Sequence, residues 1–440
     1  MEAGFIWNVA AETMPREELR ALQSQRLAAL VRRVYEHVPF YRQRMDAHGV
    51  TPASVQSLDD LPLLPFTRKQ DLRDNYPFGL LAVPREQVAR IQASSGTRGK
   101  LTVAAYTHDD ISDWAECCAR AIALAGGRPG DVLQCAYGYG LFTGGLGLHY
   151  GGERFGATVI PMSGGNTLRQ VMMLRDLQSH ILCCTPSYAL IIGEILEKEG
   201  LTTADIALRV GIFGAEPWTE EMRTEIEARL GLRATDIYGL TEVVGPGVAN
   251  ECCVARNGLH IAEDFFLAEV IDPETGAPVP DGTYGELVFT TLTKQAMPVV
   301  RYRTGDISAI LPGECICGRT TRRMARLRGR YDDMLILHGV NVYPSEIEAT
   351  LLGFEEIAPF YQIVLDWNGR TETIAVQAEM TSAYAVDAVD ADVRMLSEQI
   401  ARLLKSRFDL TMQVSLHQPG ELGRVEVGKA VRVIDRRRSG

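Results

Sequence analysis

The sequence lacks several features that would place it in a class at once. No apolar run is long enough to span a membrane, and the most apolar stretch, residues 181–196, is interrupted by polar residues and a proline. Residues 1–20 do not show the basic segment followed by an apolar segment that marks a signal peptide. Positive charge is not in excess, since the formal net charge is −11. We therefore expect a cytoplasmic protein whose main partner is neither nucleic acid nor a membrane.

A disulfide framework is also excluded, because the nine cysteines are an odd number and the expected compartment is reducing. The adjacent pairs Cys117-Cys118 and Cys183-Cys184 lie in apolar sequence and are expected to be small buried hydrophobic residues.

Three other cysteines and a histidine form a pattern of a different kind: Cys252-x7-His260 and Cys315-x-Cys317. Three thiolates and one imidazole are a closed tetrahedral ligand set for zinc, structural rather than catalytic. Cys253 could compete for ligation. The alternative is four reduced residues without a metal.

The chain has 440 residues, of which 46% are hydrophobic, enough for two or three domains. Residues 16–46 have the apolar spacing of a helix, which Pro39 interrupts, and residues 60–90 are expected to be rich in loops. Residues 100–250 alternate helical segments with short apolar strands, which predicts a mainly parallel sheet. Residues 260–312 predict an antiparallel β subdomain, and about a hundred further residues suit a small α+β domain.

The segment from Ser94 to Lys100 combines hydroxyl residues, two glycines and a lysine. Such a loop suits an anionic phosphate, because backbone N–H groups, hydroxyls and a cation can face it together. It does not have the glycine spacing of a Walker A loop. Taken alone, such a segment is more often an ordinary turn.

Four further segments downstream favour phosphate binding over an ordinary turn. In order, the five segments are Ser94-Ser95-Gly96-Thr97-Arg98-Gly99-Lys100, Tyr238-Gly239-Leu240-Thr241-Glu242, Tyr302-Arg303-Thr304-Gly305-Asp306, Gly329-Arg330-Tyr331-Asp332-Asp333 and Gly428-Lys429. Their order and spacing resemble the adenylate-forming superfamily, and most closely its phenylacetate–CoA ligase family. The resemblance implies an α/β fold. A large N-terminal domain, residues 1–330, would contain parallel sheets and the antiparallel β subdomain. A small mobile α+β domain, residues 331–440, would carry a catalytic lysine.

The resemblance also implies the chemistry. The acid would attack the α-phosphate of ATP to give acyl-AMP and pyrophosphate, and the thiol of CoA would then displace AMP. The phosphate loop would be Ser94, Ser95, Gly96, Thr97, Gly99 and Lys100. Thr241 would contact the α-phosphate and Glu242 would bind Mg²⁺. The nucleotide would further contact Glu216, Pro217, Asp236, Tyr238, Gly239, Asp306 and Arg330, with Asp306 on the ribose hydroxyls and Asp236 and Tyr238 on adenine.

Three positions of the small domain take roles from the same resemblance. Lys429 would bridge the attacking carboxylate and the phosphate and so drive adenylation. Asp332 would be the hinge about which the domain rotates after acyl-AMP has formed. Gly339 would then line the tunnel for the pantetheine arm of CoA. Some members of the family bind zinc at the positions of Cys252, His260, Cys315 and Cys317.

The acid pocket would be lined by Tyr137, Phe142, Gly214, Ala215 and Pro246. Flat aromatic walls with glycines beside them suit an aryl ring, although packing in the core explains Tyr137 and Phe142 equally well. Phenylacetate, benzoate, aminobenzoates and hydroxybenzoates all fit such a pocket, so the acid stays open.

The function expected is therefore an ATP-dependent ligase joining a small aryl carboxylic acid to CoA, in a homodimer. One alternative is an adenylating enzyme that loads the aryl acid onto a carrier protein or an amine, which shares most of these motifs. A third class is a binding protein that holds a structural zinc ion and has no catalytic activity. The presence of Lys429, Glu242 and Asp306 disfavours it.

Overall fold

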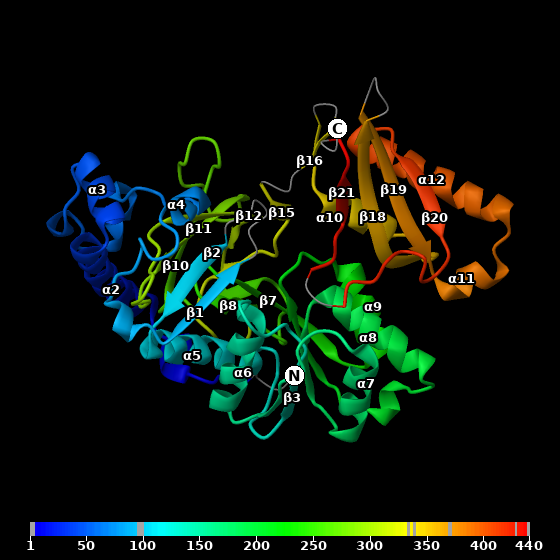
Figure 1. Cartoon of the computed structure of the whole chain (residues 1–440), viewed down its shortest axis with the longest axis horizontal. Coiled ribbons are helices and arrows are strands. Elements are labelled where there is room, and N and C mark those ends of the chain that lie inside the picture. The colour runs from blue at the N-terminus through cyan, green and yellow to red at the C-terminus, as the bar shows by residue number, and fades with distance from the viewer. Residues whose placement is uncertain are drawn as a thin grey trace.

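The computed structural model describes residues 5–94, 101–331, 335–337, 340–367, 372–426 and 429–437. Among these residues, no helix combines the length and the apolar character needed to cross a bilayer. Figure 1 shows a large N-terminal part, blue to yellow-green, and a C-terminal part, orange to red.

The largest sheet has nine strands in the order β13-β14-β9-β8-β7-β6-β5-β3-β4. The strands are β3 (Val132–Cys135), β4 (Thr158–Ile160), β5 (Ile181–Cys184), β6 (Val210–Gly214), β7 (Arg233–Leu240), β8 (Gly245–Glu251), β9 (Leu259–Ile261), β13 (Ile310–Leu311) and β14 (Arg323–Met324). From β4 to β7 the pairing is parallel, which confirms the prediction for residues 100–250, and from β7 to β13 it is antiparallel.

Helices cover both faces of the parallel strands, as crossover connections require. They are α5 (His108–Leu124), α6 (Thr143–Phe155), α7 (Thr167–Asp176), α8 (Pro186–Lys198) and α9 (Glu220–Leu230). Strand β5 shows why its sequence is apolar throughout. Leu182 and Cys184 pack with α7, α8 and α9, whereas Ile181 and Cys183 pack with α5 and α6. Both adjacent cysteine pairs are buried, as expected.

A second sheet is antiparallel, in the order β10-β11-β12-β15, and confirms the predicted β subdomain. Its strands are β10 (Phe266–Ile271), β11 (Gly285–Thr291), β12 (Tyr302–Ser308) and β15 (Gly329–Arg330). Strands β1 (Arg90–Ser94) and β2 (Thr102–Tyr106) form a separate antiparallel pair. The pairing of Ser94 with Thr102 brings together the two ends of the predicted phosphate loop.

Helices α2 (Arg16–His37), α3 (Pro39–Ala47) and α4 (Lys69–Asp74) pack against the antiparallel sheet. The short helix α1 (Val9–Glu12) instead reaches the segment between β13 and β14, where Glu12 pairs with Arg319. Short 3-10 turns lie at Pro52–Ser54, Leu58–Leu63 and Arg85–Gln87, and a further one lies before β6 at Thr203–Asp205. Pro39 ends the first long helix and starts the next, as predicted. The region 60–90 contains α4 in addition to the expected loops.

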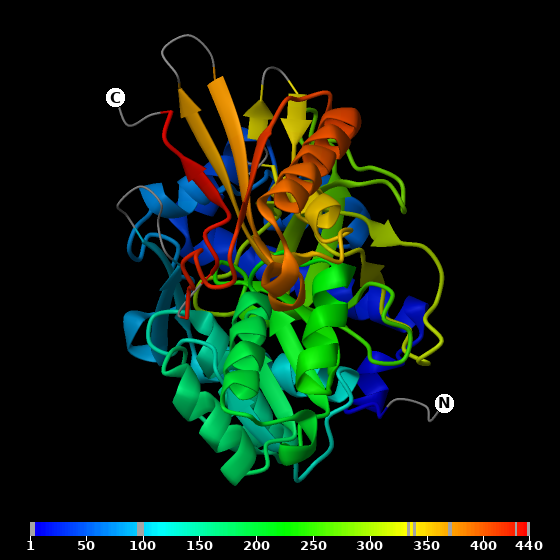
Figure 2. The same ribbon diagram turned by 90° about the vertical axis from the view of Figure 1, so that its right-hand side faces the viewer.

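The C-terminal sheet has the order β20-β19-β18-β21. Its strands are β18 (Ile357–Trp367), β19 (Glu372–Met380), β20 (Gln413–His417) and β21 (Val433–Asp435), preceded by the pair β16 (Leu335–Leu337) and β17 (Val340–Val342). Helices α10 (Pro344–Leu351), α11 (Ser382–Asp387) and α12 (Asp390–Phe408) accompany it, and Figure 2 shows α12 along one face. Ala358 and Phe360 of β18 join the apolar cluster of α8, so the sheet rests on the N-terminal part.

A buried carboxylate joins α5 to the N-terminal segment and α6. Glu116 accepts hydrogen bonds from Asn8 Nδ2 at 2.9 Å, Arg120 Nε at 3.1 Å and Arg154 Nε at 2.7 Å. Burial opposes its negative charge, but these donors outweigh burial and lower the pKa of Glu116 from 4.5 to about 2.

Substitution of Glu116 by Gln should therefore destabilise the fold in a pH-dependent way. The folded pKa lies below the unfolded one, so the charged carboxylate stabilises the fold above about pH 4.5, and this contribution is lost as the pH falls toward 2. Urea unfolding should show a loss of roughly 3 kcal/mol at pH 7 and a loss about 1 kcal/mol smaller at pH 3.5. An equal loss at both pH values would contradict this assignment.

Candidate active site

The turn between β7 and β8 carries two of the predicted catalytic residues, Thr241 and Glu242. Both are buried, with 8% and 7% of their surface exposed. Thr241 Oγ1 lies 3.3 Å from Thr143 Oγ1 at the start of α6. Glu242 Oε1 accepts a hydrogen bond from Ser94 Oγ at 3.3 Å. The structure thus brings the start of the predicted phosphate loop to the carboxylate predicted to bind magnesium.

Two further side chains reach this turn without having been predicted. Lys69 Nζ on α4 lies 3.8 Å from Glu242 Oε1. Lys294 is buried and donates to the carbonyl of Val243 at 2.8 Å, and burial lowers its pKa to about 8. Lys69 was missed because it lies in a segment expected to be loops, where a single lysine has no distinguishing pattern.

Tyr106 fixes the other end of the turn. Its hydroxyl donates to the carbonyl of Val244 at 3.0 Å, and Lys294 Nζ lies 4.7 Å from its ring centroid. Trp114 stacks on the same ring at 5.3 Å and donates from Nε1 to the carbonyl of Pro246. Three backbone carbonyl groups after Glu242, those of Val243, Val244 and Pro246, therefore accept hydrogen bonds from Lys294, Tyr106 and Trp114.

Strand β12 supplies the predicted ribose ligand. Asp306 Oδ2 accepts a hydrogen bond from the hydroxyl of Tyr238 at 2.6 Å, and Asp306 Oδ1 accepts one from Arg330 Nη1 at 3.2 Å. Burial, followed by the charge of Asp306, raises the pKa of Tyr238 well above its usual value. The three predicted nucleotide residues therefore form one group, because β12 pairs with β15 and Tyr238 crosses from β7.

Other predicted nucleotide residues lie at the carboxyl ends of β6 and β7, where ligands bind in open α/β sheets. Asp236 pairs in register with Phe213, and its carboxylate lies 3.4 Å from Arg326 Nε. Ala215, which was predicted for the acid pocket, has a φ of 72°, an uncommon left-handed conformation for a residue with a side chain. Glu216 and Pro217 follow it, and Gly239 lies near the end of β7.

Glu216 connects the two parts of the chain. Its Oε1 accepts a hydrogen bond from the backbone N–H of Ser187 at 2.8 Å, and its Oε2 accepts one from the backbone N–H of Ala430 at 3.0 Å. Ala430 follows Lys429, whose side chain is exposed. Glu216 therefore fastens the backbone beside Lys429 to the N-terminal part.

The predicted acid-pocket residues have different environments. Tyr137 is buried, and its hydroxyl has no hydrogen-bond partner in the described part of the chain. Phe142 is 54% exposed. Pro246 uses its carbonyl to anchor Trp114. A Cβ on Gly214 would lie 2.1 Å from the carbonyl oxygen of Ile237, so this glycine is required by strand spacing.

Several predicted positions lie outside the described residues. They are Ser95, Gly96, Thr97, Gly99 and Lys100 of the phosphate loop, the hinge residue Asp332 and the tunnel residue Gly339.

The four predicted zinc ligands form one cluster. The ligand atoms of Cys252, His260, Cys315 and Cys317 all lie within 4.8 Å of one another, and all four residues are buried. The Sγ atoms of Cys252 and Cys315 are 3.7 Å apart, and Cys317 Sγ lies 3.5 Å from His260 Nε2. Cys253 is outside this cluster.

Both the surroundings and the charge of the cluster suit thiolate ligands. His260 Nδ1 lies 2.8 Å from Thr321 Oγ1, which orients the ring so that Nε2 faces the cysteines. A hydrogen bond from Cys252 is the largest influence on Cys317 and lowers the pKa of that thiol to about 7. Sequence spacing found the four residues but not Thr321.

Two domain families match the chain. The AMP-binding enzyme family matches residues 1–293, and the AMP-binding enzyme C-terminal domain matches residues 339–437. A phenylacetate-coenzyme A ligase of Thermus thermophilus is 51% identical over 99% of this chain and 100% of its own. The chain belongs to the phenylacetate–CoA ligase family. The ligase of the same name from Escherichia coli is 50% identical over 97% of either chain. The protein is thus an AMP-forming acid–thiol ligase.

Solved structures extend the comparison to the arrangement of the two parts. A 2-hydroxyisobutyryl-CoA ligase in the postadenylation state, with an acyl-AMP bound, superposes with a TM-score of 0.92 at 27% identity, covering 99% of this chain and 93% of that one. The same enzyme in the thioesterification state, with CoA, superposes with a TM-score of only 0.73 at 28% identity, covering 98% and 93%. By these scores the arrangement of the two parts in this chain resembles the postadenylation state more than the thioesterification state.

The strand spacing at Gly214 gives a testable prediction. Gly214→Ala should lower the free energy of unfolding by about 1–3 kcal/mol, because β6 and β7 must separate to admit the methyl group. Thermal unfolding measures it. Gly138→Ala is the matched control, since a Cβ there meets nothing within 4 Å. Equal melting temperatures for the two variants would contradict the strand-spacing role.

Proposed function

We propose that this ligase joins an aryl carboxylic acid to CoA, with phenylacetate as the first candidate. The supporting observation is its identity of 48% to 51% with four phenylacetate-coenzyme A ligases, over 97% to 99% of this chain. These matches span both parts of the chain, whereas a fatty acid–[acyl-carrier-protein] ligase of Streptomyces coeruleorubidus is 26% identical over 48% of it.

The turn that carries Thr241 and Glu242 would receive the triphosphate of ATP. Thr241 would donate to the α-phosphate, and the loop from Ser94 to Lys100 would enclose the outer phosphates. Lys69 adds a positive charge beside Glu242, which favours the same anion. Glu242 would hold Mg²⁺, which neutralises phosphate charge when bound, and a buried carboxylate beside a hydroxyl is a suitable oxygen donor.

Asp306 would accept hydrogen bonds from the ribose hydroxyls, and Arg330 would orient it. Asp236, Tyr238 and Gly239, with the backbone of Glu216 and Pro217, would enclose adenine. The acid would then lie among Tyr137, Phe142, Gly214, Ala215 and Pro246. For the adenine and the acid, the support is that β6 and β7 are neighbours in the sheet, so that the residues after β6 lie beside Tyr238 and Gly239 of β7.

Lys429 would bridge the acid carboxylate and the α-phosphate during adenylation. After acyl-AMP has formed, residues 331–440 would rotate about Asp332 as one domain against residues 1–330, and Gly339 would face the pantetheine arm of CoA. The two arrangements of 2-hydroxyisobutyryl-CoA ligase support such a rotation. A homodimer in the cytoplasm remains our expectation for the assembled enzyme.

Release of pyrophosphate tests the function. With ATP and Mg²⁺, phenylacetate should give the largest kcat/KM in a panel with benzoate, aminobenzoates and hydroxybenzoates, and added CoA should yield phenylacetyl-CoA and AMP. Octanoate is a control acid without an aromatic ring. Adenylation without turnover of CoA would move the acceptor to a carrier protein or an amine, and no release with any acid would refute the proposal.

The cysteine cluster would hold a structural zinc ion. In a tetrahedral site with Zn–S bonds of about 2.3 Å, sulfur atoms are roughly 3.8 Å apart, and the 3.7 Å between Cys252 and Cys315 agrees with that value. Zinc would tie the ends of β8 and β9 to the segment between β13 and β14. Its contribution would be to stability, because all four positions are filled by protein.

Metal analysis tests this site. The purified enzyme should contain about one zinc per chain, and Cys317→Ser should lose most of it and melt at a lower temperature. Cys253→Ser is the matched control and should keep the metal. Equal zinc contents in the two variants, or none in the wild-type protein, would contradict the assignment.

A further inference from the structure

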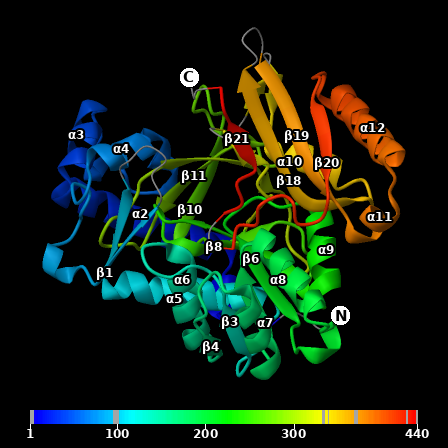
Figure 3. The ribbon, with the colours of Figure 1, turned by 45° about the vertical axis from the view of Figure 1, so that its right-hand side comes forward.

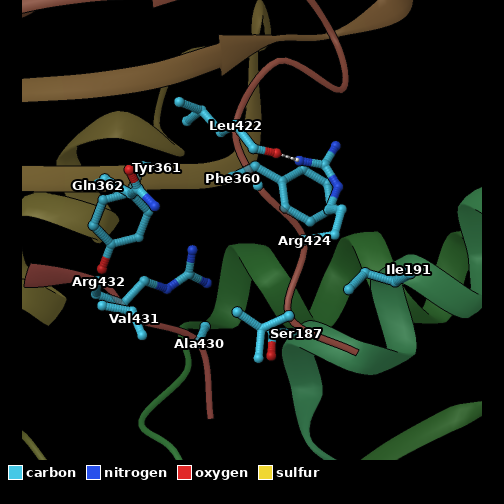
Figure 4. Close-up of a pocket in the computed structure, with 12 residues that line it drawn as sticks. Ser187, Ile191, Phe360, Tyr361, Gln362, Leu422, Arg424, Ala430, Val431 and Arg432 are labelled. Atoms are coloured by element: carbon cyan, nitrogen blue, oxygen red, sulfur yellow. Dashed lines mark hydrogen bonds between the residues drawn. The ribbon is translucent and has the colours of Figure 1, made fainter. Parts of the chain in front are cut away.

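The cavity between the two parts of the chain contains contacts that the proposed chemistry does not use. It is lined by side chains of α8, of β18 and of the C-terminal segments 422–425 and 430–432 (Figure 4). Arg424 lies at its edge, with its guanidinium carbon 3.5 Å from the ring centroid of Phe360. The C-terminal segment that carries Arg424, red in Figure 3, therefore passes close to α8.

Arg424 is shared between two carboxylates from different parts of the chain. Its Nη2 donates to Glu194 Oε1 at 3.0 Å, and its Nε donates to Glu194 Oε2 at 3.3 Å. Its Nη1 and Nη2 also donate to the two oxygens of Glu379, each at 2.8 Å. Glu194 lies on α8 and Glu379 on β19, so the guanidinium links the N-terminal part to the C-terminal sheet.

The two links to the N-terminal part lie on either side of Lys429. Arg424 precedes the lysine by five positions, and Ala430 follows it by one. Glu194 holds the first position through its carboxylate, and Glu216 holds the second through the N–H of Ala430. The side chains of Arg424 and Glu194 are each only 18% exposed, so their pairing is shielded from solvent.

The pairing with Glu194 belongs to one arrangement of the enzyme. The chain superposes with the postadenylation state of 2-hydroxyisobutyryl-CoA ligase at a TM-score of 0.92, against 0.73 for the thioesterification state. Arg424 and Glu379 lie in the same part of the chain, so their pair survives a rotation of that part. Glu194 and Glu216 lie in the N-terminal part, so the rotation would separate them from Arg424 and Ala430.

We propose that Glu194 and Glu216 are positioning residues for Lys429: they form a clamp that holds Arg424 and Ala430, which flank the lysine, against α8 and the residues after β6 in the arrangement described here, and that releases them for thioesterification. The proposal rests on the proposed role of Lys429. It predicts a defect confined to one half-reaction, since only adenylation needs Lys429 beside the α-phosphate.

Glu194→Gln tests the clamp. Single-turnover pyrophosphate release should fall roughly three- to tenfold, because the amide cannot form the charged pair with Arg424. Conversion of synthetic phenylacetyl-AMP and CoA to phenylacetyl-CoA should be as fast as in the wild type or faster. Glu197→Gln is the matched control on the same helix: Glu197 is 57% exposed and lies 3.7 Å from Arg229, away from the clamp.

Lys429→Ala separates failure of this proposal from failure of the function. If Lys429→Ala abolishes pyrophosphate release and spares thioesterification, the role of the lysine stands and Glu194→Gln decides the clamp. A Glu194→Gln enzyme that is slowed equally in both half-reactions, or in neither, overturns the clamp. If Lys429→Ala impairs both equally, the role of the lysine fails and the clamp falls with it.

Discussion

The site depends on the close approach of two backbone segments, at Gly239 and Gly245, where β7 turns into β8. A Cβ on Gly239 would lie 1.9 Å from the carbonyl oxygen of Gly245, so only glycine permits this approach. The turn places Thr241 and Glu242 at its tip, with Tyr238 near the end of β7 and Pro246 near the start of β8. Tyr106 and Lys294 then bind its carbonyl groups from behind. Residues proposed to contact phosphate, metal, nucleotide and acid are thus kept in fixed relation by one tight backbone crossing.

Sequence alone predicted most of the fold and those site residues that lie in contiguous motifs. Periodicity predicted the parallel and antiparallel sheets because burial on both faces of β5, for example, requires an unbroken apolar strand. Asp306 and Glu242 were found because each belongs to a short motif. Lys69, Thr143 and Lys294 were missed, since each acts through a partner more than fifty positions away along the chain. The steric need for glycine at Gly214 was also missed, because the spacing of β6 and β7 that imposes it is seen only in the structure.

The cysteine cluster and the active site occupy opposite ends of the same strand. Strand β8 begins beside the catalytic turn at Gly245 and ends at Glu251, one residue before Cys252. Cys252 also lies against Leu124 at the end of α5, whose Trp114 anchors Pro246. A metal at Cys252 would therefore fix one end of the strand whose other end carries Pro246, so its stabilising effect would extend along β8 to the turn.

The sharing of Arg424 between Glu194 and Glu379 has a consequence for the speed of the catalytic cycle. A guanidinium that lost its only partner during rotation would leave an unpaired cation in a shielded place, and the barrier would be high. If the C-terminal part rotates as proposed, Arg424 would keep its bidentate bond to Glu379, whereas the carboxylates of Glu194 and Glu216 would lose their partners there and be solvated by water. The groups left unpaired would then be carboxylates rather than a shielded cation, which lowers the free-energy cost of the rotation.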